Sequence, residues 1–311
     1  MPNCTFLFYR HSHVDMVREK PTGFAAKRLK PLIERSVNGS PLHVVHDRVP
    51  SIPLFDGVAE SFENLLKIRK FVRDMKGFER DWRNRTKGEL SAADRGEETP
   101  FLDHRMFPEF LAILEANRKR PGSVVNHLGF YPFEAAVEKT RSKIHISRAM
   151  EMMRFGDLNG GVRQIMESQW AMASCSLLRD AELMKQIPRL GENAVVMRGL
   201  SHTYLLELDR YSIPIVDGLG KVVEFRDIVE RKGIAIDGEV EGLKTSFREE
   251  AVRKLCSADI EMDEHQRLAL LEILYVRHLN PETAWDSQES RDSAFSLALR
   301  DVDCVNEKPY G

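Results

Sequence analysis

The sequence lacks the features that mark several large classes of protein. None of its apolar runs approaches the roughly 20 residues that a membrane-spanning helix needs, so we expect no membrane segment. The N-terminus carries neither a basic segment nor an apolar run of signal-peptide length, which favours a cytoplasmic protein. A net charge of −2 over 311 residues, without a basic stripe interleaved with aromatic residues, gives no reason to expect a nucleic-acid partner.

Cysteine is scarce, and the standard catalytic motifs are missing. The four cysteines show no C-x-x-C spacing, which argues against both a zinc knuckle and a disulfide framework. There is also no HExxH, no P-loop, no strand-linked GxGxxG and no G-x-S-x-G elbow. What is present is an ordinary composition, 42% hydrophobic and 30% charged, typical of a folded chain with a sizeable core.

Short apolar strands alternate with amphipathic helices along most of the chain. This alternation predicts an α/β fold, with a small and mostly parallel sheet flanked by many helices. We expect strands at residues 5–9, 42–45, 123–129 and 194–197, a last strand at 212–216, and helices at 24–37, 132–155 and 161–187. Pro214 favours the sheet edge for the last strand, because proline cannot donate a hydrogen bond to a neighbour.

The chain is expected to divide at about residue 220. Residues 1–220 form the predicted α/β core domain, with a helical and polar insertion at 58–120. Residues 221–311 form a predicted helical C-terminal extension, with helices around 225–231, 243–255 and 264–277. The periodicity does not assign a role to this extension.

Two distant strands each run into a Ser-His pair, which ends at His13 and at His202. Ligands of open α/β sheets bind beyond the carboxyl ends of the strands, so we expect these two histidines to share a cavity. Imidazole serves there as a general base or as a metal ligand. His11 lies on the same side of an extended segment as His13, a spacing that suits a two-histidine ligand set. The alternative is that each histidine only bonds a loop carbonyl or caps a helix.

Polar residues beside the other strand ends complete the candidate site. Asp47 follows the second strand, where it could ligate a metal or orient a histidine, or simply cap a turn. Gly199 lets the backbone turn sharply or lets a ligand approach closely, unless it only allows a helix to pack on the strand. On the third strand, Asn126 and His127 face opposite ways, so that one of them faces the cleft.

Two further charged residues are candidates for the chemistry itself. Arg179, in the helix before the fourth strand, could stabilise an oxyanion or clamp a carboxylate. Its alternative is a pair with Asp180, Glu182 or Glu167. Glu134 could serve as a general base, although a carboxylate in the first turn of a helix is also ordinary pairing with the helix dipole.

The segments LLRDAELMKQI and ENAVVMRGLSHTYLLELDRYSIPIV resemble the TraB/Tiki-like proteins and their ChaN-like and erythromycin-esterase-like relatives. Gly199–His202 fits the Gly-x-x-His of that group, and Arg179 fits its helix arginine. Arg10–His13 is similar to the first Gly-x-x-His, with Arg10 in place of glycine, and Asp47 stands where an acidic residue, usually glutamate, is typical. The resemblance covers residues 5–47 and 165–217.

This resemblance implies a hydrolase-like site at the sheet ends. Peptide cleavage in Tiki-like members depends on a metal, whereas ester cleavage in the esterase-like members does not. We therefore expect a hydrolase of a peptide or small-molecule substrate, with a divalent metal held by His11, His13, Asp47 and His202, or with His13 and His202 as general bases. The departures at Arg10 and Asp47 favour the alternative, a non-catalytic binding or regulatory protein that keeps the fold. The partner could then be a second copy of the chain, in a homodimer.

Overall fold

The computed structural model describes most of the chain outside the predicted insertion and the segment that follows the first strand. The described residues are 3–8, 24–35, 41–46, 66–67, 69–70, 116–117, 119–128, 132–190, 193–208, 210, 213–216, 222–232, 234–240, 245–279 and 288–306. The insertion predicted at 58–120 therefore lies almost entirely outside the described residues.

Strands and helices are interspersed up to β7, and the described elements after β7 are all helices. The strands are β1 (Asn3–Phe8), β2 (Leu42–His46), β3 (Val124–Leu128), β4 (Asn193–Arg198), β5 (Pro214–Val216), β6 (Val222–Glu224) and β7 (Ala235–Val240). The helices are α2 (Phe24–Arg35), α6 (Phe133–Arg154), α7 (Leu158–Gln186), α8 (Phe225–Arg231), α9 (Phe247–Cys256), α10 (Met262–His278) and α11 (Gln288–Asn306), with the 3-10 helices η2 (Ile187–Arg189) and η3 (Leu200–Glu207).

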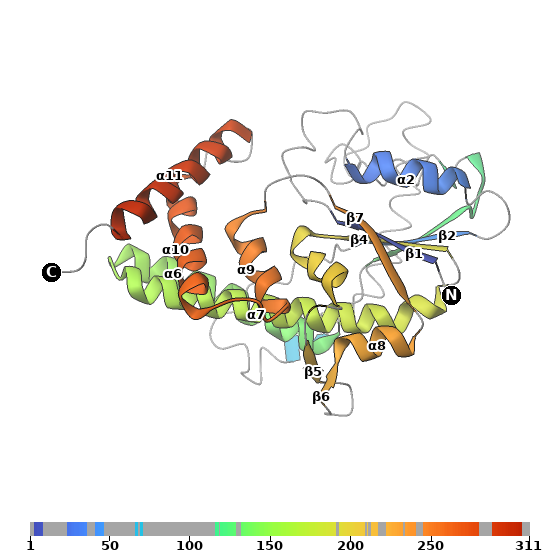
Figure 1. Cartoon of the computed structure of the whole chain (residues 1–311), viewed down its shortest axis with the longest axis horizontal. Coiled ribbons are helices and arrows are strands. Elements are labelled where there is room, and N and C mark those ends of the chain that lie inside the picture. Colours follow the sequence, from blue (N-terminus) through green and yellow to red (C-terminus); the bar gives the residue numbers. More distant parts are fainter. Residues whose placement is uncertain are drawn as a thin grey trace.

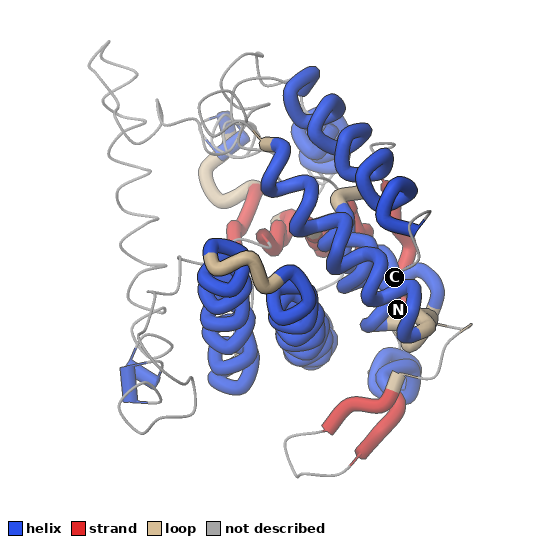
Figure 2. The backbone as a smooth tube through the Cα atoms, turned by 90° about the vertical axis from the view of Figure 1, so that its left-hand side faces the viewer, coloured by secondary structure: helices blue, strands red, loops and turns tan. Residues whose placement is uncertain are grey.

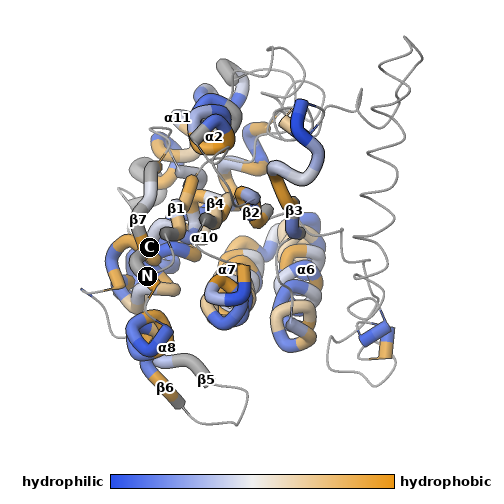
Figure 3. The backbone as a smooth tube through the Cα atoms, turned by 90° about the vertical axis from the view of Figure 1, so that its right-hand side faces the viewer, coloured by the Kyte–Doolittle hydropathy of each residue, from blue (hydrophilic) through white to orange (hydrophobic). Residues whose placement is uncertain are grey.

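Five of the strands form one parallel sheet in the order β3-β2-β4-β1-β7. Figure 3 shows this order across the sheet, with α2 above it and with α6 and α7 below. The first strand occupies an interior position, because β1 pairs with β4 on one side and with β7 on the other. The expected α/β fold with a parallel sheet and a helical C-terminal extension is confirmed.

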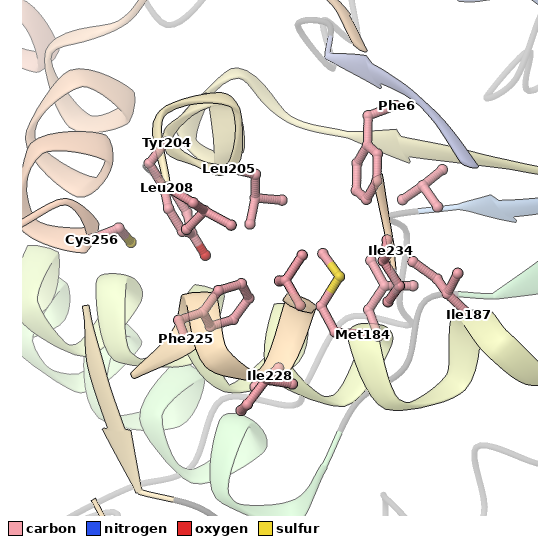
Figure 4. Close-up of a cluster of buried hydrophobic side chains, with 14 of the residues drawn as sticks. Phe6, Met184, Ile187, Tyr204, Leu205, Leu208, Phe225, Ile228, Ile234 and Cys256 are labelled. Atoms are coloured by element: carbon pink, nitrogen blue, oxygen red, sulfur yellow. The ribbon is translucent and has the colours of Figure 1, made fainter. Parts of the chain in front are cut away.

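Alternate residues of the central strands pack on opposite faces of the sheet, as the two-residue period of a strand requires. On one face, Leu29 and Ile33 of α2 pack against strand residues of the sheet, which are Leu7, Leu42, Val44, Val124, Val195 and Met197. The other face joins Phe6, Phe8, Val45 and Val196 to side chains of α7, α8 and η3. Figure 4 shows part of this second cluster, in which Phe6, Met184, Ile187 and Phe225 lie around a common interior.

The helices α6 and α7 form a long antiparallel pair beneath the sheet and beyond it (Figures 1 and 2). Asp157 caps α7, since its side chain accepts a hydrogen bond from the Gly160 amide at 2.8 Å. The helix therefore starts at Leu158, earlier than the predicted residue 161. The helices α9 and α10 pack on α7, and α11 packs on α10.

The last strand predicted at residues 212–216 forms over residues 214–216, but it does not lie at the edge of the parallel sheet. Pro214–Val216 is β5, which pairs antiparallel with β6 in a separate two-stranded sheet. The edge beside β1 is instead β7, in a segment for which the sequence predicted only helices. Its two acidic residues and Gly238 are types with low strand propensity, so its membership in the sheet depends on pairing with β1 rather than on local preference.

None of the helices in the described part of the chain combines the length and the apolar character needed to cross a membrane.

Gly238 allows β7 to approach β1 closely. A Cβ atom at this position would lie 3.0 Å from the Phe6 carbonyl oxygen and 2.9 Å from the Phe8 ring. We expect Gly238→Ala to lower the free energy of unfolding by about 1–3 kcal/mol, because the backbone carbonyl cannot move aside without disturbing the sheet. Urea denaturation of wild type and variant would measure this loss of stability. Val240→Ala, at an exposed position of the same strand, is the control, and equal midpoints for the two variants would contradict the close approach.

Candidate functional site

The strands β4 and β1 end side by side in the middle of the sheet. Phe8, the last residue of β1, is in register with Arg198, the last residue of β4. The chain leaves β1 for α2 on one face and leaves β4 for η3 on the other face. Such a divergence of neighbouring strands is where open α/β sheets bind ligands.

A buried carboxylate collects three hydrogen bonds beneath the end of β4. The Asp180 side chain, on α7, accepts from Arg198 Nε at 3.0 Å, from His202 Nδ1 at 2.6 Å and from the Tyr204 hydroxyl at 2.7 Å. His202 is 3% exposed, and the other three side chains are fully buried. These four residues are called the Asp180 network below.

Local structure places each member of the network. Asp180 lies on the face of α7 that also buries Ser176, Leu183 and Met184, so its carboxylate points into the interior. His202 and Tyr204 both lie in η3, which begins directly after Gly199, and the His202 amide donates to the Gly199 carbonyl at 3.0 Å. The strand, the short helix and α7 are therefore held together by polar contacts as well as by apolar ones.

The network is arranged so that Asp180 is ionised. Burial alone would raise its pKa, but the charges of His202 and Arg198 and the hydrogen bonds from His202 and Tyr204 outweigh burial, and the pKa lies below its ordinary value. Burial and the Asp180 charge raise the pKa of Tyr204 well above its ordinary value. Tyr204 is therefore a neutral donor, and Arg198 supplies the balancing positive charge.

The Asp180 contact fixes the tautomer of His202. An ionised carboxylate can only accept hydrogen bonds, so Nδ1 of His202 carries the proton. In the neutral imidazole the lone pair is then on Nε2, where it can accept a proton or bind a metal ion. A carboxylate behind an imidazole is the arrangement found both in catalytic triads and behind metal-ligating histidines.

Three of the predicted site residues, His11, His13 and Asp47, lie outside the described residues. The structure therefore leaves the pairing of His13 with His202 as a prediction. No group of three or more His, Cys, Asp and Glu side chains in the described part of the chain could hold a metal ion. Of the predicted metal ligands, this search covered only His202.

The other predicted site residues that the structure describes are Arg179, Glu134 and Gly199. None of these three side chains or backbones belongs to the Asp180 network. Arg179 is buried on α7, next to Asp180 in the chain, but the oxygens of Asp180 accept from Arg198, His202 and Tyr204. Glu134 is exposed in the first turn of α6. Gly199 has a φ of −68°, which any residue adopts, so the backbone there does not need glycine for a left-handed turn.

Sequence reasoning found His202 and missed the site roles of Asp180, Arg198 and Tyr204. A signal for Asp180 was present, because this carboxylate stands on the apolar face of a helix, where an unpaired charge would be costly. Arg198 carries a similar signal, as a cation at the end of an otherwise apolar strand. Neither signal names the partner, which depends on how α7 crosses β4.

A second histidine contact joins β2 and β3. Nδ1 of His43 and Nε2 of His127 are 2.9 Å apart, and the two ring planes are within 14° of parallel. One ring donates and the other accepts, so the hydrogen bond would be lost if the two rings were both in the doubly protonated, charged form. Burial lowers the pKa of His43, in agreement with a neutral ring. The His127 side chain therefore contacts the neighbouring strand β2, and the Asn126 side chain is not among those that the structure describes.

Comparisons with known proteins do not identify the chain. No family model matches it, and neither curated proteins nor solved structures give a match. The resemblance to the TraB/Tiki-like proteins accordingly remains a prediction, which these comparisons neither support nor refute.

We expect Asp180→Asn to lower the free energy of unfolding by about 3–5 kcal/mol at pH 7, because it replaces the carboxylate of a fully buried ion pair with a neutral amide. Urea denaturation of both proteins would measure the loss. The pKa of Asp180 is lower in the folded state, so its contribution is present above the unfolded value near 4 and is lost as pH falls through the folded value. The difference in the free energy of unfolding between wild type and Asp180→Asn should therefore become smaller at strongly acidic pH.

Tyr204→Phe provides a milder comparison, since it removes one donor and leaves both charges paired. A loss of about 1.5–3 kcal/mol is expected for a hydrogen bond to a charged group. Equal stability of wild type and Asp180→Asn at pH 7 would show that the network does not hold the fold together.

Proposed function

We propose that the chain is a hydrolase in which His202, oriented by Asp180, activates water at the ends of β1 and β4. The observation that carries the proposal is the 2.6 Å contact between Asp180 Oδ2 and His202 Nδ1, made beneath the divergence of the two strands. This contact fixes the proton on Nδ1 of His202 and leaves the lone pair on Nε2, which is the nitrogen proposed to act as the base. The substrate class is a peptide or ester bond, as the sequence resemblance suggests.

The chemistry follows from the two nitrogens of His202. Nε2 takes a proton from a water molecule whose oxygen attacks the carbonyl carbon, and the imidazolium formed is stabilised by the Asp180 carboxylate. The C–N or C–O bond then breaks, and the same proton passes to the leaving group. Arg198 and Tyr204 hold Asp180 ionised and in place throughout. Arg179 is the proposed cation for the negative charge that develops on the carbonyl oxygen.

A divalent metal is the second form of the same proposal. Nε2 of His202 would then be a ligand, with His11, His13 and Asp47 as the further ligands, and Asp180 would be the carboxylate behind it. The metal would supply Lewis acidity and a more acidic bound water. Both forms need the neutral Nδ1–H tautomer, and neither needs Glu134.

His202→Ala should abolish hydrolysis, because the proposal assigns the role of base to this imidazole and to no other group of the Asp180 network. We would assay ester and peptide substrates with wild type, His13→Ala and His202→Ala, after EDTA treatment and after addition of zinc or manganese, and measure bound metal by mass spectrometry. His278→Ala, which alters a histidine paired with Asp301 on α11, is the matched control and should keep wild-type turnover. Turnover unaffected by His202→Ala would overturn the proposal.

The second candidate is a non-catalytic binding or regulatory protein that keeps this fold. The 3% exposure of His202 favours it, because a fully covered imidazole is typical of a network that only ties α7 to β4. Such a protein would show neither bound metal nor turnover as wild type. Light scattering of the purified protein would establish whether its partner is a second copy of the chain.

A further inference from the structure

A second buried polar network joins α7 to α9 and α10, away from the sheet. Gln169 on α7 lies between His265 and Glu272 of α10: its Nε2 is 2.8 Å from Glu272 Oε2 and its Oε1 is 2.9 Å from His265 Nε2. Arg248 of α9 completes it, with Nε 2.9 Å from Glu272 Oε1 and NH2 3.0 Å from the Ser168 hydroxyl. We call these residues the Gln169 network.

The hydrogen bonds of this network fix the tautomer of His265. Glu272 is ionised beside Arg248 and can only accept, so the Gln169 amide nitrogen donates to it. The amide oxygen of Gln169 therefore faces His265, whose Nε2 must carry the proton. The remaining nitrogen, Nδ1, is where an added proton would bind.

His265 lies in a poor environment for a charge. Its side chain is 2% exposed, and burial lowers its pKa, an effect that the Glu167 charge on α7 only partly offsets. Two neighbouring carboxylates are already engaged: Glu272 is paired with Arg248, and Glu264, directly before His265 in α10, is paired with Lys254 of α9. Asp263 and the Glu261 carboxylate stand on the first turn of α10 and its cap.

Apolar packing continues the same interface along α10. Ala269 and Ile273 of α10 lie in a cluster with Ala149, Val162 and Ile165 of the α6–α7 pair. Loosening the start of α10 would bring water to this cluster. The Gln169 network is therefore placed where one side chain can affect the docking of a whole helix.

We propose that His265 is a proton-sensitive clasp, and that its protonation in mildly acidic solution loosens α10 from α7. The neutral ring donates to Gln169 inside the interface, whereas the imidazolium gains its hydration only when the start of α10 moves away from α7. The expected direction follows from linkage. A histidine whose pKa is lower in the folded state weakens folding as pH falls below the unfolded value near 6.5.

Trp170 reports on this histidine directly. Its ring is packed edge-on against His265, with centroids 5.9 Å apart, and it is 49% exposed. Because an imidazolium quenches a neighbouring indole, the fluorescence of a Trp82→Phe, Trp285→Phe chain should fall on acidification with a midpoint below pH 6.5. Adding His265→Gln, which keeps an amide donor near the Nε2 position, should remove that step. His278→Gln should leave it unchanged.

Hydrogen exchange and denaturation then test the loosening itself. Between pH 7.5 and 5.0, the α10 amides should lose protection beyond the intrinsic pH effect in the protein with His265 and not in His265→Gln. The folding constant should fall relative to His265→Gln by up to about tenfold for each unit by which the folded pKa lies below 6.5. A flat Trp170 signal, or equal α10 protection across this range in the chain that retains His265, would overturn the clasp. Both overturning results are measured in the chain that retains His265, so they do not require the variant to fold, and none of the measurements depends on the proposed hydrolase.

Discussion

The ionised carboxylate of Asp180, buried between α7 and the end of β4, is the constraint on which the centre of this protein depends. A buried charge of this kind is tolerated only when it is neutralised and fully hydrogen bonded. Arg198 supplies the charge, and His202 and Tyr204 supply the other donors. Since the donors come from β4 and η3, the position of the short helix follows from satisfying a single side chain on α7.

The same contacts that stabilise the fold also fix the tautomer of His202. A carboxylate that fixes one nitrogen of an imidazole leaves the other nitrogen in a defined state, and the protein needs no separate device for this purpose. Stability and the proposed reactivity of His202 are therefore coupled at Asp180, since altering this residue changes both the buried charge balance and the imidazole tautomer. The Gln169 network repeats the arrangement with an amide in place of the carboxylate, and there the imidazole is oriented within a helix interface.

The sequence predicted much of the architecture because local patterns determine it. The apolar runs that became β1, β2, β3 and β4 and the long periodic helices were all evident, and His202 was selected because it follows a strand. The failures concern pairing in space. β7 joins the sheet through β1, 232 residues earlier in the register (Asn3 with Ala235), and no local pattern could show this. For the same reason Asp180 looked like a neighbour for Arg179, whereas the crossing of α7 and β4 gave it Arg198.

The interior position of β1 also has a consequence for how the chain is assembled. In the described part of the chain β1 pairs with β4 and β7, which both follow it by about 190 residues or more, and β7 ends at Val240. The β1 segment can therefore pair within the sheet only after the residues of β4 have been synthesised, and its second neighbour follows only with β7. Contacts of such long sequence separation slow folding, and the apolar surface of β1 stays exposed until they form. We therefore expect chaperones to bind nascent chains of this protein.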